Sequence, residues 1–483
     1  MVVKLQTNRV MPLCVCLFFL VIPSFGQVLT SPPQKKPAPA PPASEGEKDR
    51  GQILKELAAT QEALLKDPSN SEAGSRLARL LYQSGEFEKA KSSVLPLLDA
   101  AKPTNDALFL SADLDYLLGH YDDAESAYTK ILALNPGDLQ IQARADSKRA
   151  MTYYQTNQYA KAADLFKGLE GKIKLPHWDL MRAFGRERPY QAVWAGDFGL
   201  SKAPFLVTDP LPIVSVEIQG RQIYALIDTG ADLFMLDTEV AAAMGIKPLA
   251  SMTGTFAGGK QAEVGLGRVD SLKIGQVSLK AVPISILPTQ RFSKGFADGK
   301  YTIGGIVGTG VLKQFLATMD YPGEQLVLRR ADEEGRADMR QTTQGKAVVE
   351  VPFVLAMTHF LMVRGSLDGK DGLTFFVDSG LASEAAFAAP VQTLKYAGIP
   401  IPETKVEDGI GGGGGGFATG LFKIARLGLG PLVQENLKGE YEANPPESYW
   451  RLGFINDGII SHQFLKKYVW TIDFVGMTMT FAN

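Results

Sequence analysis

Cysteine is almost missing from this sequence. Only Cys14 and Cys16 occur among its 483 residues, both close to the start of the chain. The rest of the chain therefore has no disulfide framework, no cysteine nucleophile and no cysteine-based metal site. Histidine is scarce too, and the four present show no close metal-ligand spacing: they are His120, His177, His359 and His462. We expect these histidines to be surface or helix-capping residues, and we expect no metal and no cofactor.

Strong net charge and phosphate-binding motifs are also lacking. The formal net charge is −2 at pH 7, which argues against nucleic acid as a partner. No phosphate loop or dinucleotide fingerprint precedes a suitable helix, and the six glycines at 411–416 lack the Lys-Ser/Thr of a P-loop. The sequence thus gives no sign of a nucleotide site.

Long apolar runs are missing as well, except for one at 13–22. Lys4 and Arg9 precede this run, and a small-x-small sequence at 24–26 follows it. The pattern is typical of a secretory signal peptide over residues 1–26, cleaved before Gln27. An uncleaved membrane anchor is the alternative, although the run is shorter than the roughly 20 residues that a span needs. We expect a bacterial protein exported to the periplasm or beyond, with no stable membrane span after cleavage.

The segments that follow are a spacer and a repeat. Residues 27–50 are rich in proline and alanine, which favours an extended linker. In residues 51–170, small and aromatic residues recur 34 and then 38 positions apart. The recurring sets are Ala78, Gly85, Phe87 and Ala90; Ala112, Gly119, Tyr121 and Ala124; and Ala150, Asn157, Tyr159 and Ala162. This pattern resembles tetratricopeptide repeats (TPR), which are stacked helical hairpins. A generic helical bundle is the alternative.

The TPR resemblance implies a protein partner on the concave face of the stack. No repeat residue belongs to a catalytic motif, so the repeats are expected to recruit partners and to take no part in catalysis. A fragment starting near residue 200 should then fold by itself. Residues 171–207 are interpreted as a connector that packs against both neighbours.

From residue 208 the pattern changes to short strands punctuated by glycine and proline, beginning with a hairpin around Gln219-Gly220. Two apolar runs in this region end alike, in Asp228-Thr229-Gly230 and Asp378-Ser379-Gly380. Each is followed by an apolar-apolar-small element, which ends at Gly308 or Ser461, 80 and 83 residues after the Asp. A buried strand that ends in a glycine turn delivers a carboxylate into a tight loop.

These paired motifs resemble an aspartic protease of the retropepsin/pepsin class, with lobes at 208–332 and 333–483. The resemblance implies that Asp228 and Asp378 share one proton and activate a water between them. It also implies supporting roles: Thr229 and Ser379 brace the loops, Gly230 and Gly380 turn the chain, and Gly308 packs beneath the first loop.

The resemblance also implies a hairpin flap over the substrate, at 253–262 with Gly258 and Gly259 at its tip. In lobe 2, Gly411 and Phe417 stand where a second flap would be, and a floppy low-complexity loop is equally compatible there. Two residues depart from the family pattern. Leu381 is bulkier than the usual small residue, and Ser461 replaces a glycine.

We therefore predict a multidomain protein with N-terminal TPR-like α-helical hairpins followed by a bilobal β-barrel aspartic protease domain. The expected function is an aspartic-type endopeptidase with an acidic pH optimum, acting on peptide or protein substrates. A proteolytically inactive protein-binding module is the alternative, and a glycosidase with two carboxylates is a third. Asp320 and Asp473 each end a strand before a glycine turn, and we interpret both as structural.

Overall fold

The structure, a computed structural model, describes residues 48–99, 101–167, 177–196, 199–256, 261–295, 299–403, 405–407, 417–442, 447–450 and 452–483. The predicted signal peptide at 1–26 and nearly all of the spacer at 27–50 lie outside these residues. None of the described helices is long and apolar enough to cross a membrane.

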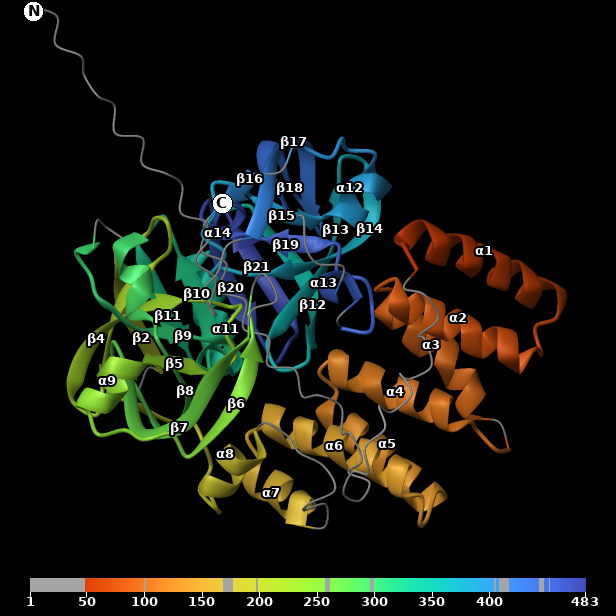
Figure 1. The fold of residues 1–483 in the computed structure, drawn as a ribbon, viewed down its shortest axis with the longest axis horizontal. Coiled ribbons are helices and arrows are strands. Elements are labelled where there is room, and N and C mark those ends of the chain that lie inside the picture. Colours follow the sequence, from red (N-terminus) through yellow and green to blue (C-terminus); the bar gives the residue numbers. More distant parts are fainter. Residues whose placement is uncertain are drawn as a thin grey trace, which may run out of the picture.

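Helices come first in the chain and form a curved array beside the β region (Figure 1). Each helix of the array packs on the next. Their bounds are α1 Arg50–Lys66, α2 Ser71–Gln83, α3 Phe87–Leu98, α4 Asn105–Leu117, α5 Tyr121–Leu134, α6 Leu139–Gln155, α7 Tyr159–Lys167 and α8 Trp178–Ala183. Fully buried alanines recur at the repeat spacing, because small side chains let helices approach closely: they are Ala78, Ala112 and Ala150.

The turns inside the three repeated helix pairs all face the β region. Gly85, Gly119 and Asn157 occupy these turns with φ of 80°, 81° and 58°, which favour glycine or asparagine. Each turn lies against a different segment of the β region. A Cβ on Gly85 would collide with Thr374, and a Cβ on Gly119 would lie 2.9 Å from Met477 Cγ. At the third turn, Asn157 Nδ2 donates a hydrogen bond to Gln314 Oε1 at 2.8 Å. The repeat pattern therefore marks the docking edge of the array.

The β region consists of two lobes, so the predicted order of helices followed by a bilobal β domain is confirmed. Lobe 1 contains β1 Gln191–Trp194, β3 Ile213–Ile218, β4 Arg221–Ile227, β5 Phe234–Asp237, α9 Thr238–Ala243, β6 Ala250–Thr255, β7 Gln261–Ile274, β8 Val277–Leu287, the 3-10 helix η2 Gln290–Gly295, β9 Ile303–Val307 and α10 Thr309–Leu312. Lobe 2 contains β13 Phe360–Leu367, β14 Lys370–Val377, β15 Phe387–Pro390, α12 Val391–Ala397, β16 Lys405–Glu407, β17 Phe417–Leu429, β18 Leu432–Glu442, α13 Glu447–Trp450, β19 Gly458–Ile460 and α14 His462–Leu465.

A shared antiparallel sheet joins the lobes. Its strands run in the order β2 Leu200–Val207, β11 Gln325–Arg329, β10 Leu316–Asp320, β20 Val469–Asp473, β21 Thr478–Ala482 and β12 Val348–Ala356. At its centre the hydroxyls of Thr318 and Thr471 lie 2.7 Å apart. Helix α11, Glu333–Thr342, links the lobes in sequence. Asp320 and Asp473 accept backbone N–H groups from the turns after their strands, as predicted for structural residues.

The helices share hydrophobic cores with both lobes. Leu81 of α2 belongs to the same buried cluster as Phe376 of lobe 2, and Tyr154 of α6 belongs to the same cluster as Met235 of lobe 1. The segment interpreted as a connector adds β1 to lobe 1 and β2 to the shared sheet. These contacts contradict the expectation that a fragment from about residue 200 folds by itself, because it would expose both cores.

Candidate active site

Each candidate catalytic aspartate follows a buried central strand. Strand β4 runs parallel to β9, and the Asp228 N–H beyond its end donates to the Val307 carbonyl at 3.0 Å. Strand β14 runs parallel to β19, and the Asp378 N–H donates to the Ile460 carbonyl at 3.0 Å. The sequence repeat thus produces the same anchoring of the two loops.

The two predicted bracing hydroxyls cross between the loops. The Thr229 N–H donates to Ser379 Oγ at 3.0 Å, and the Ser379 N–H donates to Thr229 Oγ1 at 2.9 Å. Thr229 Oγ1 donates in turn to the Val377 carbonyl at 2.9 Å, and Ser379 Oγ reaches the Ile227 carbonyl at 3.4 Å. These reciprocal bonds fix the position of one loop against the other.

Gly230 and Gly380 let the two carboxyl groups come together. Their N–H groups donate to Oδ1 of Asp228 at 2.7 Å and of Asp378 at 2.8 Å, respectively. A Cβ on Gly230 would lie 2.7 Å from Asp378 Oδ1, and a Cβ on Gly380 would collide with the Asp228 carboxyl. Each glycine therefore makes room for the aspartate of the other lobe.

Burial and mutual repulsion govern the charge of this pair. Both carboxyls have no exposed surface. Burial, followed by repulsion from Asp378, raises the pKa of Asp228 well above its ordinary value, and burial raises the pKa of Asp378 to about 6. The Oδ2 atoms of both residues have no hydrogen-bond partner among the described residues. The pair can therefore hold one proton and offer two free oxygens.

Gly308 lies beneath the first loop, where the sequence placed it. A Cβ there would collide with the Leu233 carbonyl and lie 2.8 Å from the Ala231 carbonyl. Strands β6 and β7 form the hairpin expected for a flap, pairing Ala250 with Leu266 through to the end of β6. The predicted flap glycines Gly258, Gly259 and Gly411 lie outside the described residues, and Phe417 is placed only as the first residue of β17.

The sequence analysis missed a polar contact between the helices and the first loop. Asp232, two residues after Gly230, is 5% exposed and accepts a hydrogen bond from Tyr154 of α6 at 3.1 Å. The Nε2 atom of His177 lies 3.5 Å from the same carboxylate oxygen. Burial opposes ionisation of Asp232, but the hydrogen bond with His177 and nearby charge such as that of Lys313 outweigh it and lower its pKa to about 2. The helices therefore contact the first catalytic loop, and the prediction that the repeats take no part in catalysis stays a prediction.

The bulky side chain of Leu381, which departs from the family pattern, is a core residue in the structure. It is fully buried in the cluster that joins lobe 2 to α2, α3 and α4. A salt bridge reinforces this contact from the start of α1, where Arg50 Nε donates to Asp457 Oδ1 at 2.9 Å. The larger side chain at 381 thus fills space that the helices cover.

Three of the four histidines are buried, so a surface position is wrong for them, whereas His120 and His177 do occupy helix N-cap positions, at the starts of α5 and α8. His177, His359 and His462 are 4%, 1% and 0% exposed. Each of the three has a polar neighbour. The neighbour is Asp232 for His177, Thr358 for His359 and Tyr321 for His462. Within the described ranges, no three His, Cys, Asp or Glu side chains could together hold a metal ion.

Comparison with known proteins gives one family match, over part of lobe 1. Residues 214–311 match the family model described as aspartyl protease. Lobe 1 is an aspartyl-protease-like domain. Similar solved structures include a retropepsin-like aspartic protease from Rickettsia conorii (16% identity, 29% of this chain, 94% of that chain, TM-score 0.20). The aspartic proteinase from Irpex lacteus is another (12% identity, 59% of this chain, 97% of that chain, TM-score 0.35). No curated protein sequence matches the chain.

Proposed function

We propose that this protein is an aspartic-type endopeptidase that hydrolyses peptide bonds in peptides or proteins. The observation that carries the proposal is the approach of Asp228 and Asp378 on two matching loops at the contact between the lobes. The family match of the aspartyl-protease-like domain over 214–311 supports it independently.

In the proposed mechanism one carboxyl of the pair is protonated and the other is ionised. Burial and mutual repulsion raise the pKa of the pair, so one carboxyl keeps the proton while the other acts as the base. The ionised carboxyl takes a proton from a water as that water attacks the scissile carbonyl, and the protonated carboxyl donates its proton to the carbonyl oxygen. The proton taken from the water then passes to the leaving nitrogen. As the C–N bond breaks, a hydroxyl of the tetrahedral intermediate returns a proton to the other carboxyl, which restores the singly protonated pair. The free Oδ2 atoms are suited to these transfers.

The TPR-like helices are proposed to bind a protein partner while holding the lobes. Their turns at Gly85, Gly119 and Asn157 already contact the lobes. A partner would therefore bind away from this edge, on helix surfaces that expose apolar side chains such as Leu65 and Leu139.

A proteolytically silent binding module is the second candidate, because both carboxyls are completely buried. A peptide with a hydroxyl-bearing mimic of the tetrahedral intermediate separates the two functions. An active protease should bind this peptide tightly and cleave members of a peptide library, and Asp228→Asn should lose both properties. If the wild-type chain neither binds nor cleaves from acidic to neutral pH, the module is the better description.

A further inference from the structure

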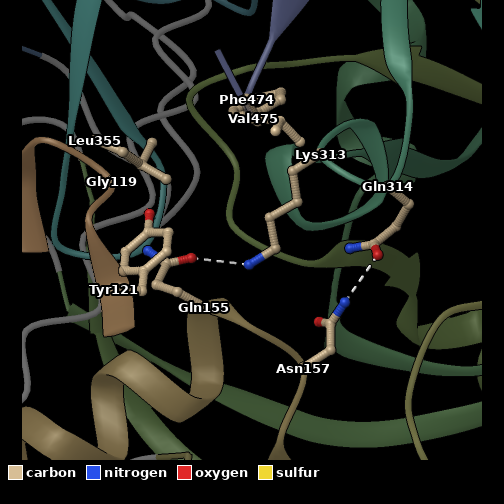
Figure 2. A pocket seen from close by; sticks show the side chains of 9 residues that line it. All are labelled: Gly119, Tyr121, Gln155, Asn157, Lys313, Gln314, Leu355, Phe474 and Val475. Carbon is tan, nitrogen blue, oxygen red and sulfur yellow. Dashed lines mark hydrogen bonds between the residues drawn. The ribbon is translucent and has the colours of Figure 1, made fainter. Parts of the chain in front are cut away.

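A cavity of about 240 Å³ lies where the helices and both lobes meet (Figure 2). Its walls come from the α4–α5 and α6–α7 turns, from the end of α10 in lobe 1, and from β12 and the β20–β21 turn in lobe 2. This volume is far above the ~10–15 Å³ that one water requires. Val475, on its wall, is 67% exposed, so the cavity reaches the surface.

A lysine without a carboxylate partner lines this cavity. Lys313 is half-buried, and its Nζ donates to Gln155 Oε1 at 2.8 Å (Figure 2). Among the described residues no carboxylate lies within ion-pair distance of this ammonium, although Asp232 acts on it from farther away. Burial lowers the pKa of Lys313 to about 8. The Tyr154 ring, whose centroid lies 5.4 Å from Nζ, adds a cation–π contact. The ammonium makes its one described hydrogen bond to the Gln155 amide, so it retains N–H groups for an anion.

A second unsatisfied polar atom and an apolar wall complete the site. Asn157 Nδ2 donates to Gln314 Oε1, while the buried Asn157 Oδ1 has no hydrogen-bond partner within the described chain. In Figure 2 this oxygen points away from Gln314. Leu355, Phe474 and Val475 supply the apolar part of the lining. The cavity therefore offers a cation, a hydrogen-bond acceptor and an apolar surface together.

We propose that this cavity binds the carboxyl terminus of a peptide whose last residue is apolar. The terminal carboxylate binds Lys313 Nζ, the amide N–H of the last residue donates to Asn157 Oδ1, and its side chain contacts Phe474 and Val475. Hydrolysis of a peptide bond creates such a terminus, so under the proposed function a product could occupy the site. The proposal itself does not require the protein to be a protease.

Binding of defined ligands to the whole protein tests the site. The probes are N-acetylphenylalanine, its C-terminal amide, phenylacetate, and acetyl-Ala-Ala-Phe with a free carboxylate, measured by calorimetry and by thermal unfolding. Both acylated acids should bind and raise the unfolding temperature. The amide should bind at least ~10-fold more weakly because it lacks the charge, and phenylacetate should bind more weakly because it lacks the N–H. If N-acetylphenylalanine binds and acetyl-Ala-Ala-Phe does not, the assignment of the cavity to a peptide terminus is wrong.

Variants of the cavity wall make the test specific. Lys313→Gln should weaken acid binding at least ~10-fold. Asn157→Gly, which tolerates the left-handed backbone, should weaken it less and remove the preference over phenylacetate. Lys247→Gln removes the same charge from an exposed position and should bind as wild type does. Equal binding of acid and amide, or unchanged binding in Lys313→Gln, refutes the site. If Lys313→Gln does not fold, Asn157→Gly and the acid–amide comparison still decide.

Discussion

The two lobes present matching loops on the same backbone but support them with different side chains. The residue beneath each loop has nearly identical torsion angles, φ −89° and ψ 176° for Gly308 and φ −93° and ψ 173° for Ser461. In lobe 1 a Cβ at 308 would press against the carbonyls of Ala231 and Asp232. In lobe 2 the Ser461 Oγ donates to the Ala385 carbonyl at 2.5 Å. Available space, rather than backbone conformation, therefore decides which residue stands there.

The helices also hold the two loops in different ways. The first loop makes a polar contact, since Asp232 accepts a hydrogen bond from Tyr154. The second makes an apolar contact, since Leu381 belongs to the buried cluster that lobe 2 shares with α2, α3 and α4. Two departures from lobe symmetry, Leu381 and Ser461, looked like a loss of function in the sequence. In the structure each has a packing partner, so neither argues against a working second lobe.

The largest expected effect is on kcat, and it tests whether the aspartates of both lobes are needed for catalysis. Asp228→Asn and Asp378→Asn should each lower kcat by about 10³-fold or more, because either change removes the shared proton system. The double variant should be little worse than either single one. Asp320→Asn, at a structural turn, is the control and should keep its turnover. Turnover near wild type in folded Asp378→Asn would show that only lobe 1 is catalytic.

The next effect concerns the apolar contact of the second loop. Leu381→Ala should lower the free energy of unfolding by about 2–5 kcal/mol, because it removes a fully buried side chain and leaves a cavity. Leu421→Ala, at a half-exposed position of β17, should change it by less than about 0.5 kcal/mol. Denaturant unfolding measures both. Similar small losses in the two variants would mean that the helices do not pack on Leu381.

Exchanging the residues beneath the loops tests the role of space. Gly308→Ser should destabilise the protein by about 3 kcal/mol, because carbonyl oxygens occupy the position of the new side chain. Ser461→Gly should cost only about 1 kcal/mol, because it loses a hydrogen bond and a helix cap. Thermal unfolding of the two variants gives the comparison. Equal losses would contradict the explanation by space.

Local sequence patterns predicted the parts of this site that repeat. The two Asp-Thr/Ser-Gly motifs identified the aspartates and their bracing hydroxyls, because strand, turn and motif are all encoded in short segments. The repeat spacing placed Gly85, Gly119 and Asn157 at equivalent positions, which are turns in the structure. Tyr154 and Lys313 gave no such signal, because their partners are distant in sequence. Which face of the helices would be covered depends on tertiary packing, so the docking of the array could not be predicted.

The raised pKa values of the pair predict how stability changes with pH. The folded protein holds protons on Asp228 and Asp378 at pH values where the unfolded chain has released them. Their stabilising contribution is therefore complete below about pH 4 and is lost as the pH rises, for Asp378 through about 6 and for Asp228 through its own raised pKa. Asp378→Asn cannot ionise, so it should gain roughly 2–3 kcal/mol over wild type between acidic and mildly alkaline pH.

Asp473→Asn is the control, because the pKa of Asp473 is lowered and its effect on stability should change with pH in the opposite direction. Burial opposes ionisation of Asp473, but the Arg336 ion pair and backbone N–H groups outweigh it and lower its pKa. This variant should lose stability relative to wild type as the pH rises, and the same direction in both variants would contradict the assignment. The raised pKa values also shift the range in which the pair holds one proton toward higher pH, so the acidic optimum that the sequence suggested should move in the same direction.

The smallest expected effect concerns the polar contact of the first loop. Tyr154→Phe removes the hydrogen bond to Asp232 and should cost about 1–2 kcal/mol of stability, because the acceptor is ionised. Asp232 lies two residues beyond Gly230, so loosening it should lower kcat more than it changes KM. Tyr153→Phe is a matched control, since the neighbouring hydroxyl donates to Glu125 within the helices. If the two variants lose stability alike and both keep full kcat, Tyr154 is only a packing residue and the helices do not position the first loop.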